Sequence, residues 1–96
     1  MDVRSLLKVM VDQEASDLYL TVDSAPAYRV HGSTQQTSAP PFTNEQLEAL
    51  ALALMRGQQR GEFEEKMEMN LALYYKELGR FRVNIFRQRG NVGIVF

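Results

Sequence analysis

A change in hydrophobic period near residue 69 constrains the fold of this chain most. From there, apolar side chains recur at every second position on both sides of a turn at residues 77–79: Leu71, Leu73, Tyr75, Phe81, Val83 and Ile85. Because side chains alternate between the two faces of a strand, this spacing predicts two antiparallel strands that turn one face to a core. Arg80, Arg82 and Asn84 must then project from the opposite face.

Positive charge is concentrated in the same region. Residues 79–96 contain four arginines and no acidic residue, whereas residues 1–78 contain seven Lys/Arg and twelve Asp/Glu. Two arginines that alternate along a strand lie about 7 Å apart on one face, a spacing suited to bidentate contacts with phosphate oxygens. The pattern alone favours a plainer interpretation, an exposed sheet face kept soluble by charge.

The rest of the chain is predicted to form short helices and strands around this pair. In the first half of the chain we expect a helix over 3–11 with Asp2 as N-cap, strands over 18–22 and 27–30, and a loop over 33–41. In the second half we expect a helix that begins at the Thr43/Gln46 capping box and ends at Arg56-Gly57. A helical turn over 58–66 and a last strand over 91–96 complete the prediction. Prolines at 40 and 41 support the loop. The order predicts an α+β domain, a mostly antiparallel sheet with helices packed on one face.

Two expectations concern charged side chains outside the predicted strands. The glutamates of the helical turn, Glu62, Glu64 and Glu65, are expected on a solvated face. Arg87 is placed in a turn over residues 87–90, which contains Gly90.

Length and composition exclude several classes of protein. The 96 residues make one domain, 1–96, too short for a core plus a catalytic lobe. There is no cysteine, and the single His31 cannot build a multi-histidine metal site. The chain has no G-x-x-x-x-G-K-[ST] loop, so it is not expected to hydrolyse a triphosphate alone. Without a long apolar run or a signal-peptide core, it is expected to be cytoplasmic.

Motifs spread over nearly the whole chain resemble one family. They are residues 15–20 (ASDLYL), Pro26 with 29–32 (RVHG), 79–84 (GRFRVN), 88–90 (QRG) and 92–96. In this order and with these separations they resemble the N-terminal domain of the type IV pilus retraction ATPases, the PilT/PilU family. Tyr19 and Asn70 stand where many relatives have histidine and aspartate, which tilts the resemblance toward the PilU branch.

The resemblance implies a PAS-like domain that precedes a RecA-like ATPase domain, which is absent from residues 1–96. In this family the full-length protein is a homo-hexameric motor for twitching motility, peripheral to the inner membrane through the pilus machinery. The N-terminal domain packs against the ATPase domains of its own and the adjacent subunit. ATP and Mg²⁺ would be bound by the full-length protein, whereas this chain is expected to hold no cofactor or metal and to be catalytically silent. An isolated copy could dimerise.

The family's site residues carry over onto the arginine-bearing strand. Arg82 matches the first of the nucleotide-facing arginines, and Arg80 and Arg89 lie in the same motif, where the resemblance implies supporting roles. A second family arginine normally follows the last strand, beyond Phe96.

Two functions of other classes stay open on the sequence. A stand-alone PAS-like small-ligand sensor would need an internal polar pocket, for which the chain offers only His31 and the tyrosines. A nucleic-acid-binding sheet would use the basic strip and one aromatic residue, namely Arg80, Arg82, Arg87, Arg89 and Phe86. Its binding would depend steeply on salt, and the acidic residues elsewhere would oppose it, so no nucleic-acid partner is expected.

Overall fold

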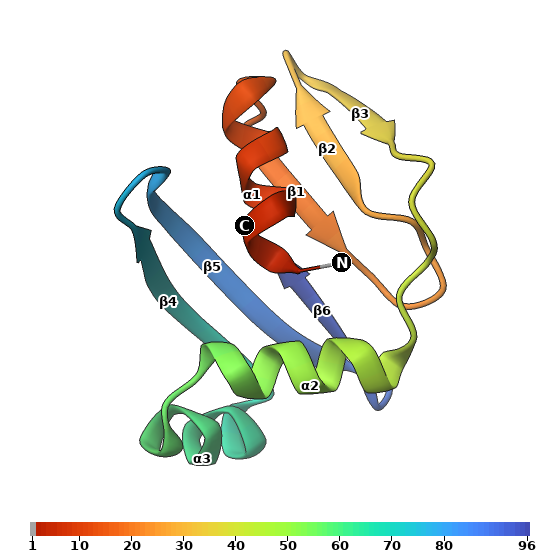
Figure 1. The fold of residues 1–96 in the computed structure, drawn as a ribbon. Coiled ribbons are helices and arrows are strands. Elements are labelled where there is room, and N and C mark those ends of the chain that lie inside the picture. The colour runs from red at the N-terminus through yellow and green to blue at the C-terminus, as the bar shows by residue number, and fades with distance from the viewer. Residues whose placement is uncertain (1) are drawn as a thin grey trace.

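A single antiparallel sheet with three helices makes up this chain in the computed structural model, which describes residues 2–96 (Figure 1). The elements are α1 (Val3–Asp12), β1 (Asp17–Leu20), β2 (Ala27–Val30), β3 (Ser33–Gln36), α2 (Asn44–Leu54), α3 (Gly57–Lys66), β4 (Glu68–Tyr75), β5 (Gly79–Gln88) and β6 (Asn91–Val95). The strands are ordered β3-β2-β1-β6-β5-β4 across the sheet. The predicted α+β class with a mostly antiparallel sheet is therefore confirmed.

The strand register collects the apolar residues on one face of the sheet. Leu20 lies opposite Ile94, Ile94 opposite Ile85, and Ile85 opposite Met69. Opposite residues of antiparallel strands point to the same side, so these four side chains form one continuous apolar row. α1 and α2 cross this face in Figure 1, and α3 adds the buried Phe63 to the same core. Within residues 2–96, no helix packs on the other face of the sheet.

The predicted helix starts are confirmed by their capping hydrogen bonds. The Asp2 carboxylate accepts a hydrogen bond from the backbone N–H of Ser5 at 2.8 Å. Thr43 and Gln46 exchange both bonds of a capping box, at 2.9 and 3.1 Å. These side chains satisfy backbone donors that have no partner inside the helix, so they fix where each helix begins. None of the helices within residues 2–96 is long and apolar enough to span a membrane.

The loop predicted over residues 33–41 is wrong in its first half. Residues Ser33–Gln36 form β3, which pairs with β2 at the edge of the sheet. A two-residue turn at His31 (φ 49°) and Gly32 (φ 80°) returns the chain directly into this strand. All four β3 side chains are exposed, so the strand has no apolar residue to reveal it.

Two element boundaries also differ from those predicted. β5 continues to Gln88 and turns only at Arg89 (φ 55°) and Gly90 (φ 80°), so Arg87 belongs to the strand. Gly57 opens α3 instead of closing α2, which ends at Leu54. The predicted turn thus began two residues too early, and Gly57 was assigned to the end of α2 although it begins α3.

Candidate functional site

Strand β5 presents Arg80 and Arg82 on the open face of the sheet. Both residues are exposed, and on the neighbouring strand β4 they lie opposite Tyr74 and Ala72 respectively. Within residues 2–96, neither arginine takes part in an ion pair. The structure thus brings these two predicted site residues together, with both guanidinium groups available to a partner.

Arg89 lies elsewhere. It occupies the turn between β5 and β6, seven residues along from Arg82, which corresponds to about 23 Å in an extended strand. Its side chain is exposed. The structure therefore does not gather Arg89 with Arg80 and Arg82, and the three cannot contact one phosphate group together.

A polar cluster that the sequence did not reveal adjoins Arg82 on the open face. The Asn84 amide donates hydrogen bonds to Asn70 Oδ1 at 2.8 Å and to Glu68 Oε1 at 3.2 Å. Asn84 follows Arg82 by two positions, so both point to the same side. The alternation along β5 was enough to place Asn84 on the same face as Arg82. Its pairing with Asn70 and Glu68, however, depends on the register between β5 and β4.

A cleft of about 480 Å³ adjoins Arg82 and Asn84. Its lining combines the polar residues Ser16, Asp17 and Asn70 with apolar residues, among them Met10, Phe81 and Phe96.

Arg87 points the opposite way, into the helix-covered side of the sheet. Its guanidinium binds Glu48 of α2 through bonds of 2.6 and 2.9 Å and Glu64 of α3 at 3.1 Å, and it lies 5.3 Å from the centre of the Phe63 ring. The Arg87 side chain is only 17% exposed. Hydrogen bonds from Arg87 hold the pKa of Glu48 below its ordinary value, and Glu48 in turn raises the pKa of Arg87.

The glutamates of α3 and the nucleic-acid alternative can now be assessed. Glu62, Glu64 and Glu65 are all exposed, as predicted, and Glu64 also forms an ion pair with Arg87. The strip of four arginines needed for a nucleic-acid-binding sheet does not exist, because Arg87 is on the other face. Phe86 is also engaged, since its ring covers Gly93 so closely that a Cβ there would overlap it. The open face therefore lacks the arrangement that this alternative required.

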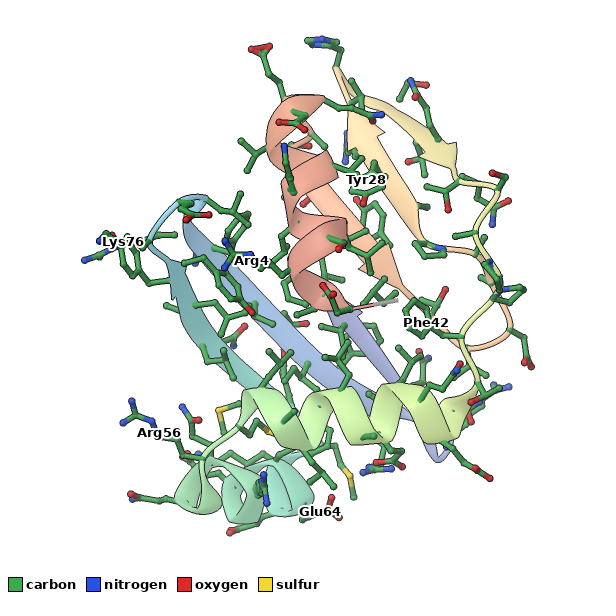
Figure 2. The ribbon with its side chains drawn as sticks, viewed as in Figure 1. Arg4, Tyr28, Phe42, Arg56, Glu64 and Lys76 are labelled. Atoms are coloured by element: carbon green, nitrogen blue, oxygen red, sulfur yellow. The ribbon has the colours of Figure 1, made fainter. Side chains whose placement is uncertain are left out.

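The remaining candidate chemistry finds little support in the part of the chain that is described. His31 is exposed at the β2–β3 turn, and residues 2–96 contain no group of three or more His, Cys, Asp or Glu that could hold a metal ion. No polar or charged residue is buried among them. Tyr28 is buried and points toward α1 (Figure 2), where its hydroxyl donates to the Leu6 carbonyl at 2.7 Å. A sensor's polar interior pocket is thus not formed by these residues.

Comparisons of the sequence find relatives among pilus ATPases, although no family model matches the chain. It is 38% identical over 95 residues to the type IV pilus ATPase PilU of Pseudomonas aeruginosa, covering 99% of this chain and 25% of the relative. It is 38% identical over 96 residues to the retraction ATPase PilT of the same organism, covering all of this chain and 28% of the relative. The chain thus spans about a quarter of the length of these curated relatives. Because the two identities are equal, the tilt toward PilU stays a prediction.

Solved structures give the same fold. The pilus retraction motor PilT with bound ADP superposes with a TM-score of 0.89 at 30% identity, over 99% of this chain and 28% of the motor. The ATPase DotB of Legionella pneumophila superposes with a TM-score of 0.80 over 97% of this chain and 27% of DotB; at 15% identity it supports the fold alone.

Proposed function

Because the chain is an N-terminal domain of the PilT/PilU family of type IV pilus ATPases, we propose that it is the assembly and regulatory domain of a pilus retraction ATPase. The observation that carries this proposal is the asymmetry of the sheet. One face is closed by helices over an apolar core, whereas the open face presents Arg80 and Arg82 without ion-pair partners among residues 2–96. That face is available to a second domain.

The proposed role of Arg82 is to approach the phosphates of ATP bound by an ATPase domain. A guanidinium supplied from a separate domain stabilises phosphate charge only when the two domains close. Nucleotide state would then be coupled to domain rotation. The exposure of Arg82 on the open face, without an ion-pair partner among residues 2–96, supports this role. Arg80, two residues away, would assist.

The wider assembly follows from the same proposal. ATP and Mg²⁺ would be held by the ATPase domain, so residues 1–96 would be catalytically silent by themselves. The full-length protein would form a homo-hexamer in which this domain packs against its own and the adjacent ATPase domain, at the cytoplasmic side of the inner membrane with the pilus machinery.

Substitution of Arg82 in the full-length protein tests the proposal. Arg82→Ala should lower kcat for ATP hydrolysis by up to about 10³-fold, the lower range for an arginine supplied in trans, and should leave the fold intact. Arg29→Ala is the matched control, because Arg29 is exposed on the same open face but belongs to β2, three strands away. Unchanged hydrolysis in Arg82→Ala, or an equal loss in Arg29→Ala, would overturn the nucleotide-facing role.

A further inference from the structure

Strand β4 forms an open edge of the sheet. All eight of its residues pair with β5 on one side, and β4 is the last strand in the sheet order (Figure 1). On its outer side, residues 68–74 make no backbone hydrogen bond to any other part of residues 2–96. Half of their amide and carbonyl groups are therefore free to pair with another strand.

This edge lacks the features that usually prevent strand addition. Residues 69–75 (MNLALYY) contain no charged residue and no proline. Met69 is buried, but Leu71, Leu73 and Tyr75 are only partly buried, and Tyr74 is 66% exposed. β3, the edge at the other end of the sheet, has four residues with exposed polar side chains. The two edges are thus unequal, and β4 is the one suited to pairing.

We propose that β4 binds β4 of a second copy of this chain in an antiparallel pair, with Ala72 on the two-fold axis. This register sets Leu71 of each copy opposite Leu73 of the other. It also sets Glu68 opposite Lys76 twice, once at each end of the pair. Figure 2 shows Lys76 at the turn after β4, pointing away from the molecule. Like apolar residues therefore meet in the centre and opposite charges meet at both ends.

Charge complementarity selects this register over its neighbours. Opposite residues of an antiparallel pair share a face, so the register can shift only in steps that keep Leu71 and Leu73 on the helix-covered side. The next register in one direction sets Glu68 opposite Tyr74. The next in the other direction sets Lys76 opposite Asn70. Both lose the two ion pairs, and only pairing about Ala72 joins the opposite charges.

Charge reversal tests this pairing directly. The chain of residues 1–96 has its own continuous hydrophobic core, and its association can be measured by sedimentation over a range of concentrations. We expect a monomer–dimer equilibrium in which Glu68→Lys and Lys76→Glu each weaken the dimer by about tenfold in Kd. The double variant Glu68→Lys/Lys76→Glu should restore it, because each end again joins opposite charges.

Lys76→Glu separates an effect on the dimer from an effect on the monomer. Glu68 accepts a hydrogen bond from Asn84, so Glu68→Lys alters the monomer as well, whereas Lys76 forms no ion pair within residues 2–96. Circular dichroism of each variant checks the fold. The proposal would be overturned if the chain stays monomeric at all concentrations. It would also be overturned if the single substitutions leave the Kd of the dimer unchanged, or if the double substitution does not restore it.

Amide hydrogen exchange gives an independent measurement that needs no variant. The outward amides of β4 should exchange more slowly as protein concentration rises, whereas those of β3 at the opposite edge should not change. Protection that rises equally at both edges, or only outside β4, would place the contact elsewhere. The inference concerns the 96-residue chain itself and does not depend on the proposed function.

Discussion

The guanidinium of Arg87 and the carboxylate of Glu48 form a two-bond ion pair, at 2.6 and 2.9 Å, between the end of β5 and the middle of α2. The pair joins the sheet to the helix that crosses it. Because Glu64 of α3 binds the same guanidinium, one side chain connects a strand and two helices. Arg87 therefore stabilises the domain, although it belongs to the same basic segment as the exposed Arg80 and Arg82.

Removing this guanidinium should destabilise the domain. Arg87→Ala leaves Glu48 without its partner, and we expect the free energy of unfolding to fall by about 1–3 kcal/mol. Arg87→Lys should retain only part of this stabilisation, because an ammonium group cannot form the two parallel hydrogen bonds to Glu48. Urea denaturation measures both. Arg89→Ala is the control, since Arg89 is exposed in the adjacent turn and should change stability by less than about 0.5 kcal/mol. Equal effects at 87 and 89 would contradict this prediction.

The same pair should make stability depend on acid pH. Arg87 lowers the pKa of Glu48 in the folded protein below its ordinary value of 4.5. A group whose pKa is lower when folded contributes stability that is complete above the ordinary value and is lost as pH falls through the folded value. The difference in unfolding free energy between the wild type and Glu48→Gln should therefore be largest near neutral pH and shrink below about pH 4.5. A constant difference from pH 7 to pH 3 would refute the assignment.

A glycine in β6 should resist substitution because of an aromatic ring. Gly93 lies opposite Phe86, whose ring occupies the space of a Cβ at position 93. Gly93→Ala should cost about 1 kcal/mol, since the ring must move toward solvent. In Phe86→Ala the same glycine substitution should cost clearly less, and a double-mutant cycle measures this coupling. Additive effects would show that the ring does not constrain position 93.

If the proposed function holds, the positions of Arg80, Arg82 and Arg89 predict how their substitutions combine in ATP hydrolysis by the full-length protein. Arg80 and Arg82 share one patch, so their alanine substitutions should be non-additive in kcat/KM. Arg89 is about 23 Å from Arg82 along the strand, so Arg82→Ala and Arg89→Ala should combine additively. Strong coupling between Arg82→Ala and Arg89→Ala would contradict this prediction.

Local patterns in the sequence were sufficient to predict most of the helices and strands. The capping box at Thr43 and the alternation through Phe81 and Val83 depend on residues close together in the chain, and both are confirmed. The exposure of Arg80 and Arg82 followed from the same alternation. β3 escaped prediction because a fully exposed polar edge strand has no alternation to detect.

Periodicity and capping act over a few neighbouring residues, so they predicted the apolar face of β5, the face that carries Arg82 and the starts of the main helices. The partners of these residues depend on the tertiary fold. Arg87 meets Glu48 across 39 positions, Asn84 meets Asn70 across 14, and β4 is left as an open edge. Contacts of this kind depend on strand order and register, which arise when the whole chain packs around one core.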